Sequence, residues 1–274
     1  MTFDEILASD SLIPSLPATV AELLREFQRG EPDVRRVTAL LETEVGLTVR
    51  MLRLVNSAAH GRGAERIGSV EAAIALLGLA ATRQLVSAAA VGGAFKGVPG
   101  LDMAEFWRFS LDVAKIAQAV AVSVGLDRGH AFTAGLLHGT GDLIMKMAMP
   151  QRPCLRPPLQ TDGDRLYTQA IDLGYSYAEV GAAFAERWEF PTPIVDAIRR
   201  HGDAASGDQP DTLAGALYLA CWSARAHELE FDGPALCDHY PRGVAAAIGF
   251  VDEQLICDGR PIEWTRPEEA REFA

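Results

Sequence analysis

The sequence lacks the features that mark secreted, disulfide-stabilised and nucleic-acid-binding proteins. Its four cysteines include no C-x-x-C pair, so neither a zinc site nor a disulfide framework is expected. A formal net charge of −12 provides no broad basic surface for nucleic acid or an anionic membrane. The N-terminal segment MTFDEILASD carries acidic residues where a secretory signal has basic ones. We therefore expect a cytoplasmic protein that binds neither nucleic acid nor membranes.

The sequence also has no uninterrupted apolar run of the kind that crosses a membrane. The nearest approach runs from Ala72 to Phe95, where Arg83 is the only charged residue. An arginine near the centre of a span costs about 2.5–3.5 kcal/mol, and Gly78 interrupts the run. Two short buried helices that meet near Gly78 and Leu79 explain this segment better than a span does.

Helical spacing of apolar residues extends over most of the chain, and no run alternates with a period of two. Hydrophobic residues make up 49% of the chain and charged residues 23%, as in a packed globular protein. Helices are predicted to begin near Pro17, after an N-cap at Asp33, near Leu47, and after Ser69. A short amphipathic helix is predicted within residues 245–256. The expected fold class is all-α.

The central segment AGLLHGTGDLIMKM, residues 134–147, combines helical spacing with one histidine and two glycines. Gly139 and Gly141 interrupt the apolar pattern directly after His138. Glycine weakens a helix interior, so a break beside a histidine in apolar sequence is unusual. The segment therefore predicts a helix break with an imidazole beside it.

This central segment resembles the L-L-H-D-x-G-K motif of HD-domain and HD-GYP phosphohydrolases. The preceding FSLDVAKIA, within residues 106–124, resembles the H-S-x-x-V-A helix of the same superfamily. The N-terminal segments LIPSLPATVAELL, LTVRMLRLVNSA and SVEAAIALLG resemble the HDOD domain, a bacterial helical module related to HD domains. The residues that fit its pattern are Leu16, Pro17, Leu52, Arg53, Asn56, Ser57, Ala73, Ile74, Leu77 and Gly78. Glu44-Val45 stands where that family usually has Asp-Pro.

The segment LGYSYAEVGAAFAERWEFPTPIVDAIRRHGD continues the resemblance into the second half of the chain. Its matching residues are Gly174, Val180, Gly181, Trp188, Pro191, Ile194, Ala197, Ile198 and His201. Tyr177 and Gly202 stand where the family often has histidines. The resemblance covers residues 12–226. It implies a five-helix N-terminal bundle of about residues 1–98 packed on an HD-like bundle of about residues 102–228, followed by a helical tail over 229–274.

The metal ligands of an HD phosphohydrolase are mostly replaced in this sequence. The resemblance places Phe109 at the first histidine, His138 and Gly139 at the His-Asp pair, and Cys221 at the last aspartate. Asp142 stands where a lysine would balance phosphate charge, and an aspartate there would repel a phosphate. One imidazole cannot form a coordination set that activates water. We therefore expect no metal, no cofactor and no catalysis, and interpret His138 as a packed histidine.

Three functions remain open at this point. The resemblance favours a non-catalytic signalling or regulatory module that acts by binding other proteins. A second reading is a small-molecule or nucleotide sensor whose vestigial pocket contains His138, Asp142, Tyr177 and His201. The third is a phosphohydrolase with a relocated metal site. Sequence identifies neither the partner nor the oligomeric state.

The helix over about residues 47–58 is the candidate partner face. Arg50 and Arg53 fall on the side opposite its apolar residues, where they either contact a partner or are solvated. Asn56 and Ser57 at its end could contact a ligand. Caps for backbone groups before the following loop are the simpler interpretation of these two side chains.

Overall fold

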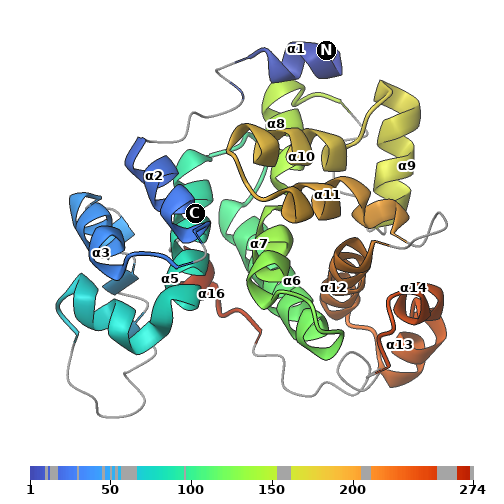
Figure 1. The fold of residues 1–274 in the computed structure, drawn as a ribbon. Helices are drawn as coiled ribbons and strands as arrows, with labels where there is room; N and C mark the ends of the chain where they lie inside the picture. The colour runs from blue at the N-terminus through green and yellow to red at the C-terminus, as the bar shows by residue number, and fades with distance from the viewer. Residues whose placement is uncertain are drawn as a thin grey trace.

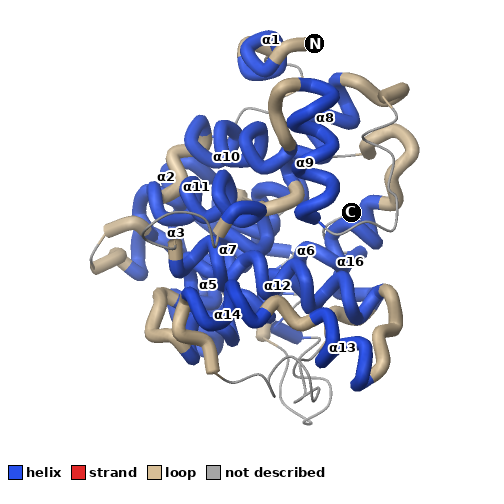
Figure 2. Tube along the Cα trace, turned by 90° about the vertical axis from the view of Figure 1, so that its right-hand side faces the viewer, coloured by secondary structure: helices blue, strands red, loops and turns tan. Residues whose placement is uncertain are grey.

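Helices supply all the regular secondary structure that the computed structural model describes, and none of its described residues forms a strand (Figure 2). The described residues are 1–9, 12, 18–29, 31–44, 47–49, 51–52, 55–56, 67–95, 97–152, 162–204, 211–251 and 264–271. The all-α prediction is confirmed.

The N-terminal part contains helices α2 (Ala18–Phe27), α3 (Val34–Thr43) and α5 (Val70–Ala94), which pack on one another (Figure 1). Asp33 accepts hydrogen bonds from Arg35 N and Arg36 N, and Ser69 accepts one from Ala72 N. The predicted N-cap at Asp33 and the predicted helix start at Ser69 are therefore confirmed. Within residues 47–58, the described Leu47, Met51 and Val55 are all buried.

Helix α1 (Phe3–Leu7) does not pack with these helices, unlike the predicted bundle of residues 1–98. It lies on α8 (Thr140–Ala148) and α10 (Tyr177–Arg187), at the top of the view in Figure 1. Tyr175 Oη donates to Met1 O at 2.8 Å, and the Tyr175 and Phe3 rings are 5.7 Å apart. The first helix therefore belongs with the HD-like half of the protein.

Helix α5 is broken at Gly78, as the sequence predicts. Gly78 has φ 78° and ψ 163°, a left-handed φ that an L side chain rarely adopts. By length and composition α5 is the one helix in the described part of the chain that could cross a membrane. The break leaves residues 79–94 as the longer helical piece, which is shorter than the about 20 residues that a span needs. Much of that piece, including Leu85, Val86 and Val91, is buried inside the protein.

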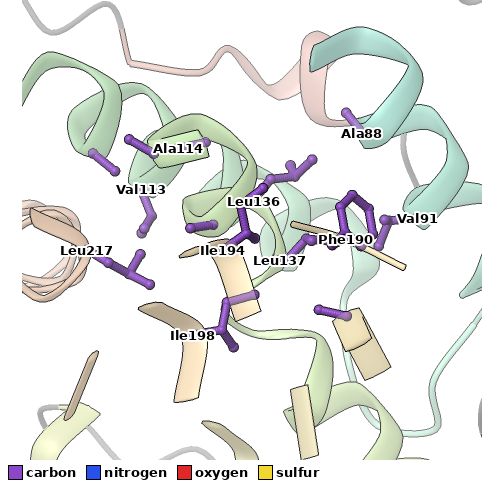
Figure 3. Packing of buried hydrophobic residues seen from close by; sticks show 14 of the residues in the cluster. Ala88, Val91, Val113, Ala114, Leu136, Leu137, Phe190, Ile194, Ile198 and Leu217 are labelled. Atoms are coloured by element: carbon purple, nitrogen blue, oxygen red, sulfur yellow. The ribbon is translucent and has the colours of Figure 1, made fainter. Parts of the chain in front are cut away.

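The HD-like half is built around α6 (Met103–Ser123) and α7 (Arg128–Leu137). A Cβ at Gly135 of α7 would lie 2.6 Å from Ala114 Cα, so only glycine lets the two backbones approach this closely. Helices α11 (Thr192–Arg200) and α12 (Thr212–Glu228) pack against this pair, whereas α9 (Asp162–Leu173) lies against α10. Figure 3 shows Val113 and Ala114 of α6, Leu136 and Leu137 of α7, Ile194 and Ile198 of α11, and Leu217 of α12 converging on one core.

Helices α8 and α10 cross in contact at a pair of glycines. A Cβ at Gly141 would lie 1.9 Å from Tyr177 O and 2.5 Å from Gly181 N. No larger residue fits without separating the helices. This crossing places Tyr177, the first residue of α10, beside the break that follows α7.

The tail contains α13 (Gly233–His239), α14 (Arg242–Ala247) and α16 (Pro267–Arg271). The helix predicted within residues 245–256 begins earlier and stops sooner, because Gly249 takes a left-handed φ of 72° and Phe250 N donates back to Ala245 O. Residues 252–256 lie outside the described part. Helix α16 returns to α6, where Thr265 N donates to Asp112 Oδ1 at 2.7 Å.

Candidate functional site

His138 lies at the joint between α7 and α8, with Gly139 next to it as the N-cap residue of α8. The side chain is only 3% exposed. Its Nδ1 is 2.6 Å from Gly135 O, and a carbonyl oxygen can only accept a hydrogen bond. Nδ1 therefore carries the proton in the neutral ring, and Nε2 keeps the lone pair. The helix break beside His138 is confirmed.

His201 and Tyr177 form a buried pair next to His138. His201 begins the short 3₁₀ turn η2 (His201–Asp203) and is 0% exposed. Its Nδ1 is 2.7 Å from Ile198 O, and its Nε2 is 3.0 Å from Tyr177 Oη. Because Nδ1 donates to the carbonyl, Nε2 of the neutral ring accepts a hydrogen bond from the Tyr177 hydroxyl. The rings of His138 and His201 are 6.2 Å apart, so three members of the predicted pocket do come together.

Two phenylalanines of α6 occupy the space around His138 and Gly139. The Phe109 ring is 5.8 Å from the His138 ring. One helical turn earlier, Phe106 approaches the other residue, since a Cβ at Gly139 would lie 3.0 Å from its Cε2 atom. An aspartate at position 139 would therefore meet the Phe106 ring. The sequence shows that the two phenylalanines are three residues apart and so share one helix face. It does not show that this face contacts His138 and Gly139.

Arg225 of α12 completes this aromatic cluster, and sequence reasoning missed it. Its guanidinium lies over the Phe109 ring at 4.4 Å from the ring centre. It also pairs with Glu228, which in turn contacts Arg108 of α6 at 3.0 Å. A cation–π contact and an ion-pair chain thus hold Phe109 between α6 and α12.

The residues at the HD metal positions do not fit a divalent metal. Phe109 and Gly139 have no donor atoms, which leaves one imidazole and the thiol of Cys221, a residue buried in α12. Across the residues that the structure describes, no three His, Cys, Asp or Glu side chains gather in a group able to hold a metal ion. Zinc sites in proteins use three or four protein ligands.

Asp142, the fourth predicted pocket residue, lies in a charged layer next to Tyr177. Its carboxylate is 3.6 Å from Lys146 Nζ and 3.0 Å from Arg165 Nη2. The Arg165 guanidinium also stacks over the Tyr177 ring at 4.9 Å. Asp142 is therefore balanced by two cations, and the cluster of three charges has a net charge of +1. Lys146 could have been found at i+4 from Asp142, whereas Arg165 comes from a different helix.

The candidate partner residues Arg50 and Arg53 lie outside the described residues, so they stay a prediction. The capping interpretation of Asn56 is confirmed. Its Nδ2 donates to Leu52 O and to Ile67 O, and its Oδ1 accepts from Ile67 N, all at 2.8 Å. The amide therefore joins the helix end to the segment after the following loop. Ser57 is outside the described part.

The packed helices, the broken joint at His138 and the close α8–α10 crossing define an HD-like helical module. The model of the HDOD domain family matches residues 13–204, and the chain belongs to this family. A protein from Shewanella amazonensis SB2B, provisionally named a phosphohydrolase, has a similar structure: the TM-score is 0.79 with 28% identity, covering 98% of this chain and 100% of that one.

Two further proteins are similar over most of this chain. A structure from Marinobacter aquaeolei VT8, provisionally named a signal transduction protein, has a TM-score of 0.72 and 22% identity over 96% of this chain and 60% of that one. An uncharacterised protein of Treponema pallidum (strain Nichols) is 27% identical over 89% of this chain and 47% of its own length. The chain thus spans about half the length of this curated relative.

Proposed function

We propose that this chain is a non-catalytic regulatory module of bacterial signal transduction, which acts in the cytoplasm by binding a protein partner. The observation that carries the proposal is the pair of phenyl rings from α6. Phe106 lies where a side chain at Gly139 would begin, and Phe109 lies against His138. Ring carbons therefore lie at or against the positions at which the HD resemblance places three of the metal ligands.

Several features of the surrounding site support the same proposal. Metal-assisted hydrolysis needs a bound water with a lowered pKa and an open coordination position. His138 is 3% exposed and His201 is fully buried, so a phosphoester would have to displace packed side chains to reach either imidazole. Tyr177 engages His201 through its hydroxyl, which favours a structural role for that histidine. Similarity to a protein named for signal transduction agrees with a regulatory role.

A small-molecule sensor is the second candidate, and the cations around Asp142 favour it. Arg165 and Lys146 flank this carboxylate and keep 17% and 10% of their side chains exposed. An anionic ligand could replace Asp142 as their partner. The buried Tyr177–His201 pair next to this cluster would then report occupancy to α10 and α11.

Affinity capture from a native lysate tests the partner proposal. The bait is the full chain carrying Arg50→Glu and Arg53→Glu, compared with the wild-type chain. The matched control reverses Arg199 and Arg200, whose side chains are 41% and 48% exposed on α11. We expect the first pair alone to lose the captured protein. The control variant should keep an unfolding free energy within about 0.5 kcal/mol of the wild type, because its two arginines are exposed.

The result that would overturn the proposal is equally specific. Turnover of a phosphodiester such as bis(4-nitrophenyl) phosphate that disappears in His138→Ala would make the chain an enzyme. A partner captured equally by all three baits would keep the module but exclude the helix over residues 47–58 as its contact face.

A further inference from the structure

A pocket of about 180 Å³ opens between α5, α6, α7 and α16, on the side of α6 away from its phenylalanines. Leu85 of α5, Leu111 of α6 and Phe132 of α7 provide its apolar walls. Ala81 and Leu77 of α5 line it near the break at Gly78. None of the residues discussed at His138 lines this pocket, and the HD-like metal positions are not part of it.

Three polar side chains lie at the same pocket. Lys115 Nζ of α6 is 3.6 Å from Glu269 Oε2 of α16. Gln84 of α5 also lines the pocket, and its Nε2 is buried with no hydrogen-bond partner in the described structure. A buried amide without a partner is unfavourable, and a ligand offering an acceptor would satisfy it after a small turn of the glutamine side chain.

We propose that this pocket binds a small monocarboxylate with an apolar body. A dry cavity of roughly 150 Å³ accommodates benzene, so this volume suits a ring or a chain of about six to eight carbons. Lys115 and Gln84 offer N–H donors, which favour a carboxylate head group over a cation. The neighbouring Glu269 carboxylate disfavours nucleotides and other polyanions more than it disfavours a monocarboxylate, because each further negative charge would be repelled by Glu269 without a second cation among the described residues that line the pocket to attract it.

The head-group end of the pocket is formed by the C-terminal segment. Glu269 Oε1 accepts hydrogen bonds from Arg266 at 2.9 and 2.7 Å, and Ala270 of α16 is 1% exposed. A bound carboxylate would compete with Glu269 for Lys115 while Arg266 keeps Glu269 in place. Binding therefore requires no displacement of α16. The site does not depend on the proposed partner-binding function, and the experiment that tests one does not test the other.

Calorimetric titration of the full chain with octanoate tests the site, with octanol and octylamine as comparison ligands. We expect one octanoate per chain and a rise in Tm, because a ligand that prefers the folded state stabilises it. Octanol should bind about tenfold more weakly and octylamine more weakly still, since neither has a negative charge for Lys115.

Three variants test the location and the chemistry of the site. Ala81→Phe fills the pocket and should weaken octanoate binding at least tenfold, whereas Ala80→Phe, at an exposed position that does not line the pocket, should bind as the wild type does. Lys115→Met keeps the aliphatic stem, so it should lose the preference for octanoate over octanol and still bind octanol. Absence of octanoate binding to the wild type, equal affinity of the two phenylalanine variants, or an unchanged preference in Lys115→Met would each overturn the proposal.

Discussion

The cluster at His138 and the pocket at Lys115 lie along the same helix, α6, yet their polar groups are in opposite situations. At His138, both described imidazoles are buried and donate to backbone carbonyls, and Tyr177 hydrogen-bonds His201. At Lys115, a buried amide of Gln84 has no partner in the described structure, and an ion pair borders an apolar pocket. In the first region both imidazoles have hydrogen-bond partners within the protein. In the second region the Gln84 amide could still donate a hydrogen bond to a ligand.

The spacing along α6 explains how one helix serves both regions. Phe106 and Phe109 are three residues apart and face the joint between α7 and α8. Leu111 and Lys115 are four residues apart and face α5 and α16. Residues three or four apart lie on one helix face, so α6 presents two separate faces to two different environments. The metal-ligand positions of an HD enzyme therefore do not indicate where along α6 the pocket lies.

The largest expected effect comes from breaking the packing that supports the His138 region. In Gly141→Ala the new Cβ would lie 1.9 Å from Tyr177 O, so α8 and α10 must separate. We expect the free energy of unfolding to fall by about 3 kcal/mol or more, measured by urea unfolding. The control is Gly243→Ala, whose Cβ meets nothing within 4 Å. Similar stabilities of the two variants would contradict the close crossing.

A smaller loss in the free energy of unfolding is expected when one hydrogen bond of the His138 region, between Tyr177 and His201, is removed. Tyr177→Phe leaves the buried His201 Nε2 without the tyrosine hydroxyl, at a cost of about 1–3 kcal/mol in the free energy of unfolding. Tyr167→Phe is the matched control, because Tyr167 of α9 is 70% exposed and should change stability by less than about 0.5 kcal/mol. If the two variants unfold at the same urea concentration, the Tyr177–His201 bond contributes nothing.

The α6–α16 contact should make a pH-dependent contribution to stability. Burial raises the pKa of Asp112 above its ordinary value of 3.8, although Thr265, Lys115 and Arg108 oppose the change. Between 3.8 and the raised pKa the folded chain holds more protons on Asp112 than the unfolded chain does. This carboxyl therefore makes the free energy of unfolding fall as pH rises through that window.

Asp112→Asn removes this titration and keeps an oxygen that accepts from Thr265 N. Its Tm relative to the wild type should therefore rise between about pH 4 and pH 7. Asp238→Asn, on the exposed side of α13, should follow the wild type. Glu269 acts in the opposite direction. Burial tends to raise its pKa, but Arg266 and Lys115 hold the pKa below its ordinary value of 4.5. The stability that this carboxylate contributes is therefore lost as the pH falls through its lowered pKa. A constant difference in Tm across the series would exclude Asp112 as the source.

The smallest effect is expected from metal. Added Mn²⁺ should leave the Tm of the wild-type chain within about 1 °C, since only a ligand that prefers the folded state raises it. Elemental analysis of protein dialysed without chelator should find well under one equivalent of manganese, iron or zinc. A stoichiometric metal that is lost in His138→Ala would show that the His138 region coordinates a metal after all.

Much of the fold could be predicted because its signals are local. Asp33 and Ser69 cap helices through backbone groups two or three residues away, and Gly78 breaks α5 through its own φ. The break beside His138 is also marked by a local glycine, although Gly139 has a right-handed φ of −87°. Helix α1 was assigned to the wrong bundle, because its contacts with Tyr175 and Arg187 come from residues far along the chain.

The sequence by itself determined the helices, their caps, the HDOD resemblance and the loss of donor atoms at Phe109 and Gly139. Only the tertiary structure decided what occupies those positions and where a pocket remains. Phe106 meets Gly139, Arg165 pairs with Asp142, and Glu269 pairs with Lys115 because separate helices cross at particular angles and distances. Helical periodicity shows which face of a helix is apolar, but the partner of that face depends on how all the helices pack together.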